Sequence, residues 1–145
     1  MPVRDPSAPA RIIGDVRLAD TLSARRTILS SLRADEGEPF VVGTIDYIGV
    51  NTTFHALEHT NMALGPHGFY GAHSIVHGGP AFDATTRSGA RLQLGSSAVL
   101  FQSHVGNGVT IGSRSLVQAS DLPDGAVVPD HTVMVGGSVL NRVEW

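Results

Sequence analysis

The chain has 145 residues, of which 41% are hydrophobic and 16% are charged, and its net charge is −3 with the histidines neutral. This length and composition fit one folded domain, residues 1–145, and exclude a disordered chain. The basic residues are scattered, which argues against nucleic acid or membrane as a partner, and the lack of cysteine restricts any zinc site to His, Asp or Glu ligands.

The chain opens with a proline-rich segment, residues 1–10, that we expect to be flexible. This segment lacks the apolar core of a signal peptide, and no later run reaches the length of a membrane-spanning helix. We therefore expect a cytoplasmic location. Residues 18–32 carry apolar side chains at helical spacing, but we interpret them as an irregular early coil.

From Val42 onward, apolar residues recur at intervals of six, and a glycine or proline often follows them. The apolar positions include Val42, Ile48, Phe54, Val105, Ile111, Val117, Val128 and Met134. Such hexapeptide repeats are typical of a parallel β-helix, in which each unit forms a short strand and a corner. Glycine suits corners where φ is positive or space is scarce. The pattern predicts an all-β chain of stacked triangular coils; the alternative is a β-sandwich with period-two strands and hairpins.

Two stretches interrupt this rhythm. Residues 60–72 contain few inward aliphatic positions, and residues 81–93 are mostly polar or small. We expect both to leave the coil as loops, where functional variation concentrates. We expect no long C-terminal helix after the last repeat.

Five of the seven histidines lie between residues 55 and 77. The interval from His55 to His77 fits one coil of about 18 residues plus a small loop, which would stack both side chains on one face. His73 would lie around a corner, where it can face a neighbouring subunit. Three neutral imidazoles and an open water position are typical of catalytic zinc. The alternative is a set of polar interface histidines without metal.

Two glutamates are candidates for proton transfer. Zinc lowers the pKa of a bound water to about 7, and the released proton then needs a carrier. Glu36 belongs to the segment 31–40, which is dense in charged residues, and Glu58 lies three residues after His55. The alternative for Glu36 is a structural ion-pair cluster with Arg33 and Asp35, and Glu58 is alternatively a solvated residue.

Several blocks of the sequence resemble the γ-class carbonic anhydrases. They are residues 13–16, 31–39, 42–43, 55–58, 72–73, 77–80, 99–107 and 122–125. The resemblance implies a left-handed parallel β-helix that forms a homotrimer. It also implies Zn²⁺, with Fe²⁺ or Co²⁺ as alternatives, bound at the subunit interface by three histidines, and reversible hydration of CO2 to bicarbonate by a metal-bound hydroxide.

The resemblance also implies roles for individual residues. His55 and His77 would bind the metal together with His73 of the neighbouring subunit. Glu36 matches the active-site proton acceptor and Glu58 an outer proton shuttle. Arg33 and Asp35 match a structural pair near the trimer interface, and no residue is assigned to substrate binding.

The spacing of the histidines departs from the family pattern. The family has four residues between its second and third histidines, whereas three separate His73 from His77. A shift of one residue along a strand turns a side chain to the opposite face. We therefore expect a backbone adjustment, or replacement of the ligand by His59 or His67.

A second departure precedes His55. A glutamine and an aspartate of the family are replaced by Gly49 and Val50, and an active-site asparagine is replaced by Tyr47. We expect Gly49 to open space beside the metal, which would admit a larger substrate than CO2.

The sequence thus supports several functions. The first is carbonic anhydrase activity; the second is a metal-dependent hydratase or lyase for a larger carbonyl compound. The third is a non-catalytic trimeric scaffold or bicarbonate-binding protein, which the altered histidine spacing favours. Acyl transfer is a fourth, with His104 as the available general base.

Overall fold

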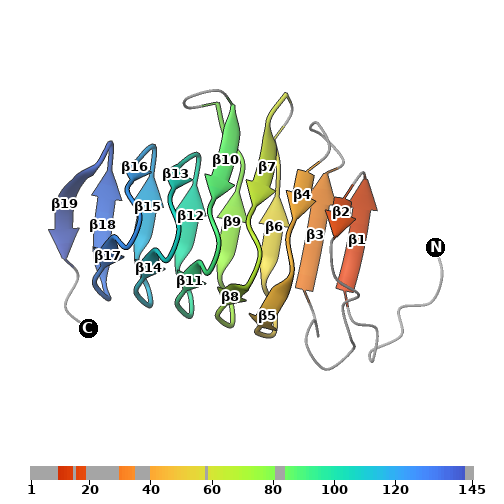
Figure 1. Cartoon of the computed structure of the whole chain (residues 1–145), viewed down its shortest axis with the longest axis horizontal. Coiled ribbons are helices and arrows are strands. Elements are labelled where there is room, and N and C mark those ends of the chain that lie inside the picture. The colour runs from red at the N-terminus through yellow and green to blue at the C-terminus, as the bar shows by residue number, and fades with distance from the viewer. Residues whose placement is uncertain are drawn as a thin grey trace.

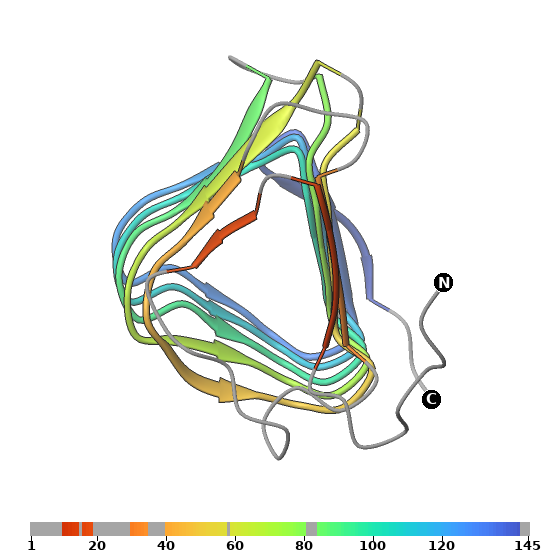
Figure 2. The same ribbon diagram turned by 90° about the vertical axis from the view of Figure 1, so that its right-hand side faces the viewer.

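The computed structural model describes residues 10–14, 16–18, 30–34, 40–57, 59–80 and 84–142. All regular elements in these ranges are β-strands, and successive strands step around a triangle to form stacked coils (Figures 1 and 2). Strands on each side of the triangle pair in parallel with the coils before and after them. The predicted left-handed parallel β-helix is therefore confirmed, and no helix occurs in the part of the chain described.

Three sheets form the sides of the triangle. Sheet A contains β1 (Ala10–Gly14), β3 (Ser30–Ala34), β6 (Thr53–His55), β9 (Ile75–His77), β12 (Val99–Phe101), β15 (Leu116–Gln118), β18 (Thr132–Val135) and β19 (Ser138–Arg142). Sheet B contains β2 (Val16–Leu18), β4 (Phe40–Val42), β7 (Asn61–Leu64), β10 (Thr85–Ser88), β13 (His104–Val105) and β16 (Asp121–Leu122). Sheet C contains β5 (Ile45–Ile48), β8 (Gly68–Tyr70), β11 (Gln93–Leu94), β14 (Thr110–Ile111) and β17 (Val127–Val128).

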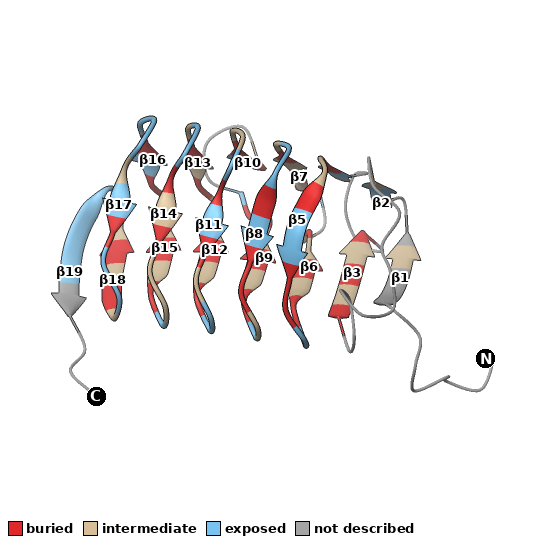
Figure 3. Ribbon diagram, turned by 60° about the horizontal axis from the view of Figure 1, so that its bottom comes forward, coloured by how far each residue is buried: buried red, intermediate tan, exposed pale blue. Residues whose placement is uncertain are grey.

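The core consists of columns of apolar side chains that point into the triangle. The inward column of sheet A consists of Leu32, Phe54, Val76, Leu100, Val117 and Met134. The apolar members of the inward column of sheet B are Val42, Leu64, Val105 and Leu122. The inward column of sheet C consists of Ile48, Tyr70, Leu94, Ile111 and Val128. These columns include the predicted six-residue positions, and each coil buries its apolar face only against its neighbours. Figure 3 shows the resulting alternation of buried and exposed positions along the strands.

Glycine is required at two corners because the coils approach each other closely there. At the corner between sheets C and A, a Cβ on Gly49 would lie 2.4 Å from the backbone nitrogen of Ala72, and one on Gly95 would lie 2.5 Å from that of Ser113. At the corner between sheets B and C, a Cβ on Gly65 would lie 2.4 Å from the carbonyl oxygen of Gly89. The glycines that follow inward apolar residues therefore mark scarce space rather than positive φ.

Non-glycine residues of positive φ form another column at the corner between sheets C and A, which we call the C–A corner. This column consists of Asn51, His73, Ser97, Arg114 and His131, with φ of 55°, 60°, 58°, 56° and 59°. The left-handed conformation is uncommon for such residues, and here it recurs once per coil to turn the chain from one sheet to the next.

Coil length is regular only in the C-terminal half. Gln118 pairs with both Phe101 and Val135, so these coils contain 17 residues rather than the expected 18. Extra residues of the earlier coils are inserted at the corner between sheets A and B. Phe101 pairs with His77, and His104 pairs with Arg87, so the two intervals span the same corner on adjacent coils. The interval from Phe101 to His104 is three residues, whereas the interval from His77 to Arg87 is ten. Figure 2 shows the coils of β7 and β10 reaching outward there.

The predicted loops are therefore largely wrong. Residues 60–72 contain β7 and β8, and residues 81–93 contain β10 and the first residue of β11, all paired in register within the sheets. Their inward positions hold side chains such as Met62 and Tyr70, which the search for aliphatic repeats overlooked. Residues 81–83 lie outside the described part, as do residues 1–9 and 19–29, so a flexible N-terminus and an irregular early coil stay predictions.

Where the chain is described, it has no helix of the length and hydropathy needed to cross a membrane.

Replacing Gly95 by alanine tests the close approach of the coils. The added Cβ would meet the backbone of Ser113 at 2.5 Å, and we expect the free energy of unfolding to fall by about 1–3 kcal/mol. Denaturant unfolding at fixed protein concentration measures the change. Gly108→Asn is the matched control, because Gly108 has φ of +65° with open space around it and asparagine tolerates that conformation. Equal stability of both variants would contradict the packing argument.

Tyr70 presents a second test of the core. Its ring is fully buried and packs edge-on against Phe54 at 4.8 Å, and its hydroxyl has no hydrogen-bond partner among the described residues. Burial raises the pKa of the Tyr70 hydroxyl above its ordinary value. The hydroxyl is therefore neutral in the folded chain and costs stability because it is desolvated without a partner.

We expect Tyr70→Phe to raise the free energy of unfolding by about 1 kcal/mol. Above about pH 10 the unfolded chain loses the tyrosine proton while the folded chain retains it, so the wild type loses stability that the variant keeps. Denaturant unfolding at neutral pH and near pH 10.5 measures both effects. A clearly destabilised variant would mean that the hydroxyl has a partner.

Candidate metal centre

Two histidines stack on the outer face of sheet A. His55 ends β6 and His77 ends β9, and the two residues pair in register on adjacent coils. Phe54 and Val76, the residues before them, point into the core with no exposed surface. Because side chains alternate along a strand, both imidazoles point outward and are half-buried. The predicted stacking of His55 over His77 is confirmed.

The hydrogen bonds of His77 define which of its ring nitrogens carries a proton. Its Nδ1 lies 2.8 Å from the carbonyl oxygen of Gly78, so Nδ1–H donates to that oxygen. Its Nε2 is left with a lone pair and lies 3.2 Å from Nδ1 of His55. The two rings are nearly perpendicular, with centroids 4.9 Å apart and an interplanar angle of 89°.

This geometry fits two ligands of a zinc ion. Ligand nitrogens at 2.0–2.1 Å from tetrahedral zinc lie about 3.3 Å from each other, which matches the observed 3.2 Å between His55 Nδ1 and His77 Nε2. A ligand histidine commonly donates its second ring nitrogen to a carbonyl oxygen, as His77 does. The donor atoms of the pair therefore suit a divalent metal ion.

The backbone that carries the pair is fixed on both sides. Gly78 N donates to the His55 carbonyl at 2.8 Å, and Gln102 N donates to the His77 carbonyl at 3.1 Å. Thr86 Oγ1 also donates to the His77 carbonyl at 3.1 Å. These bonds fix the backbone from which both rings project before any ligand binds, which favours binding because less ordering remains to be done.

His73 does not join the pair within one chain. It lies at the C–A corner with an exposed side chain, and its Nδ1 is 3.1 Å from Nδ2 of Asn51. Within the described ranges, no three His, Asp or Glu side chains come together closely enough to hold a metal ion. As predicted, His73 lies at a corner, where the chain has left the strand and turns with φ of 60°.

The other histidines lie at different places in the fold. His67 bonds to Asp46 at 3.1 Å on the corner between sheets B and C, and His59 is exposed near the corner between sheets A and B. Neither completes a three-ligand cluster among the residues described. His104, the candidate base for acyl transfer, places its Nε2 2.9 Å from the carbonyl oxygen of Thr85 and thereby tethers the inserted corner.

Of the four charged candidate residues Arg33, Asp35, Glu36 and Glu58, only Arg33 lies in the described part of the chain. It precedes His55 by one coil and pairs with it in register, so it extends the column of the two histidines. Asp35, Glu36 and Glu58 lie outside the described residues, and their roles stay predictions.

Two neighbours of the histidines were missed by the sequence analysis. The ring of Phe101 packs edge-on against His77 with centroids 5.1 Å apart, and Asn51 contacts His73. Asn51 precedes His73 by 22 residues, the interval that also separates His55 from His77. Applying that interval to each candidate ligand would have found Asn51.

The expectation that Gly49 opens space beside the metal is wrong. A Cβ on Gly49 would lie 2.4 Å from the nitrogen and 2.5 Å from the Cα of Ala72. The backbone of the next coil therefore fills the space that a side chain at this position would take, and Gly49 is buried.

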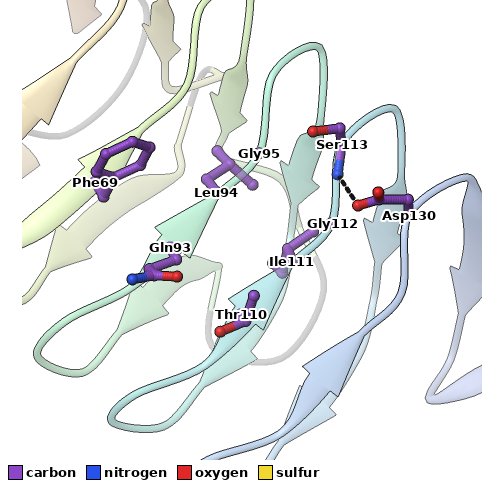
Figure 4. A pocket seen from close by; sticks show the side chains of 9 residues that line it. All are labelled: Phe69, Gln93, Leu94, Gly95, Thr110, Ile111, Gly112, Ser113 and Asp130. Carbon is purple, nitrogen blue, oxygen red and sulfur yellow. Dashed lines mark hydrogen bonds between the residues drawn. The ribbon is translucent and has the colours of Figure 1, made fainter.

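A separate shallow hollow lies on sheet C beside the C–A corner (Figure 4). Phe69, Gln93 and Thr110 are among the residues that line it. Its acidic residue, Asp130, accepts a hydrogen bond from the backbone nitrogen of Ser113 at 2.8 Å. The carboxylate thus supports the corner, and the histidine pair remains the better candidate for chemistry.

The chain is 31% identical over 135 residues to the carboxysome assembly protein CcmM of Synechocystis sp., and 30% identical over 155 residues to CcmM of Synechococcus elongatus. It is 28% identical over 165 residues to a carbonic anhydrase of Methanosarcina thermophila. These alignments include 86%, 98% and 98% of this chain, but only 18%, 28% and 64% of the relatives. No family model matches the chain.

Proposed function

Because the chain is a divergent member of the γ-class carbonic anhydrase family, we propose that it is a metal-dependent lyase that reversibly hydrates CO2 to bicarbonate. The observation that carries this proposal is the His55–His77 pair, whose nitrogens are 3.2 Å apart. The Gly78 carbonyl keeps Nδ1 of His77 protonated and leaves Nε2 available to a metal.

The proposed metal is Zn²⁺, with Fe²⁺ or Co²⁺ as alternatives that the same imidazole ligands accept. His55 and His77 would bind it together with His73 of a second copy. A zinc ion lowers the pKa of a bound water to about 7, which supplies a nucleophile for CO2 at neutral pH. Phe101 packs against His77 and would keep one side of the site apolar, which suits a small uncharged substrate.

A homotrimer would complete the site, with each metal held between two subunits. A row of aliphatic side chains on the outside of sheet A supports this arrangement: Ile75, Val99, Leu116 and Val133 are consecutive in register and only partly exposed. A second copy packed on this row would cover it. It would also come close to the histidine pair, because His77 lies only two residues after Ile75 on the same strand. His73, exposed at the adjacent corner, is placed to reach such a neighbour.

Proton transfer falls to Glu36, with Glu58 as an outer shuttle. A positioned carboxylate accelerates such a step by about 10²–10⁴-fold. Arg33, in register with His55, would pair with Asp35 and hold the segment that carries Glu36. A cytoplasmic location is part of the same prediction.

Two alternatives have specific support. Tyr47 and Phe69 stack with ring centroids 4.5 Å apart and are 46% and 40% exposed, on the same two coils as the histidine pair. An aromatic surface there favours a larger carbonyl substrate. The short His73–His77 spacing and the relatives named as carboxysome assembly proteins favour a non-catalytic scaffold or bicarbonate-binding protein.

The first test is the metal content of the purified chain. We expect about one zinc or iron ion per chain, and nearly none in His55→Ala or His77→Ala, as measured by plasma mass spectrometry. His67→Ala is the matched control, because His67 pairs with Asp46 on another corner. A metal-free wild type, even after anaerobic reconstitution, would favour the scaffold.

The second test is the rate of CO2 hydration by stopped flow. We expect the metal-loaded chain to catalyse the reaction, and Glu36→Gln to lower the rate about 100-fold without loss of metal. Glu38→Gln, two residues away and expected to be a surface charge, should keep the wild-type rate. A metal-loaded chain that does not hydrate CO2 would contradict the proposed activity and favour the larger carbonyl substrate.

A further inference from the structure

Asn51 and His73 occupy the same position on adjacent coils of the C–A corner. Both have positive φ, 55° and 60°, and the backbone nitrogen of His73 donates to the carbonyl oxygen of Val50 at 3.0 Å. The pair lies on the coils that also hold His55 and His77, four residues before each of them. The corner pair is therefore level with the histidine pair along the axis of the β-helix.

The side chains of the corner pair are in contact. Nδ2 of Asn51 lies 3.1 Å from Nδ1 of His73, and both residues are exposed. This contact occupies the ring nitrogen nearer the chain. Nε2, at the far edge of the imidazole, is left as the nitrogen that can meet another molecule.

The amide of asparagine can serve either neutral form of histidine, because it carries a donor and an acceptor. When its oxygen accepts from Nδ1–H, Nε2 has a lone pair and can bind a metal. When its nitrogen donates to Nδ1, Nε2 carries the proton and cannot. With its oxygen turned toward His73, the amide of Asn51 therefore favours the neutral form whose Nε2 can bind a metal. Hydrogen-bonded neighbours of ligand histidines commonly fix the protonated nitrogen in this way.

We propose that Asn51 is a positioning residue, which holds His73 at the corner so that Nε2 is presented to a second copy of the chain as the third metal ligand. This inference rests on the proposed function, since it assigns a purpose to His73 only if the interface binds metal. The corner conformation itself does not demand asparagine, because Ser97 and Arg114 adopt it on the following coils. The contact with His73 is what distinguishes Asn51 from them.

The test uses the full chain loaded with Co²⁺, with affinity measured by chelator competition and ligand geometry by visible absorption. Asn51→Gly removes the amide and keeps a residue that accepts positive φ, so folding is spared. We expect Co²⁺ to bind about tenfold more weakly and the absorption bands to change. Asn51→Asp retains the acceptor oxygens and should restore wild-type affinity and spectrum.

Ser97→Gly is the matched control, because it makes the glycine substitution at the same corner position, one coil beyond His73, with φ of 58°. It should bind Co²⁺ as the wild type does. Wild-type binding by Asn51→Gly, in a chain whose His73→Ala variant loses the metal, would overturn the positioning role and leave the proposed function intact. If His73→Ala bound Co²⁺ as tightly as the wild type, His73 would not be a metal ligand. That result would contradict both the proposed site between subunits and the positioning role of Asn51.

Discussion

The spacing of the coils is the constraint on which the rest of the structure depends. Neighbouring strands of a sheet lie about 4.8 Å apart, and at two corners the backbone of one coil reaches that of the next with no room for a Cβ. Gly49, Gly65 and Gly95 meet this requirement. With the corners held in this way, each strand keeps its register with the strands before and after it. His55 and His77, 22 residues apart in sequence, are thereby brought to a nitrogen separation of 3.2 Å.

The same register explains why a single chain would carry only part of the proposed metal site. Sheet A presents two imidazoles side by side, while His73 is turned away at the corner and contacts Asn51. A monomer thus offers two imidazole nitrogens as ligands. A zinc ion with an open water position requires a third protein ligand, which would have to come from another subunit. Packing of a second copy against the aliphatic row of sheet A would bury apolar surface and supply that ligand in one event. Assembly and metal binding would then stabilise each other.

The fold could be predicted from the sequence because two features recur along it for physical reasons. An inward apolar residue recurs in most units, and glycine recurs at the two corners where the coils approach each other closely. The stacking of His55 on His77 followed from that repeat. The loops at 60–72 and 81–93 were predicted wrongly because Met62 and Tyr70 fill inward positions that a search for aliphatic residues passes over. Gly49 was misread because its role depends on Ala72, a residue of the next coil. The contact of Asn51 with His73 was missed for the same reason, since it joins two coils.

A mixed-trimer experiment tests the central claim that each metal lies between a histidine pair of one subunit and His73 of another. Chains carrying His73→Ala and chains carrying His77→Ala are unfolded, mixed and refolded together, and metal is counted in trimers that contain both. Each variant alone should hold almost no metal, whereas a mixed trimer should hold about one ion, because one of its interfaces joins an intact pair to an intact His73. Mixed trimers without metal, or full metal in the His73→Ala trimer alone, would contradict the account.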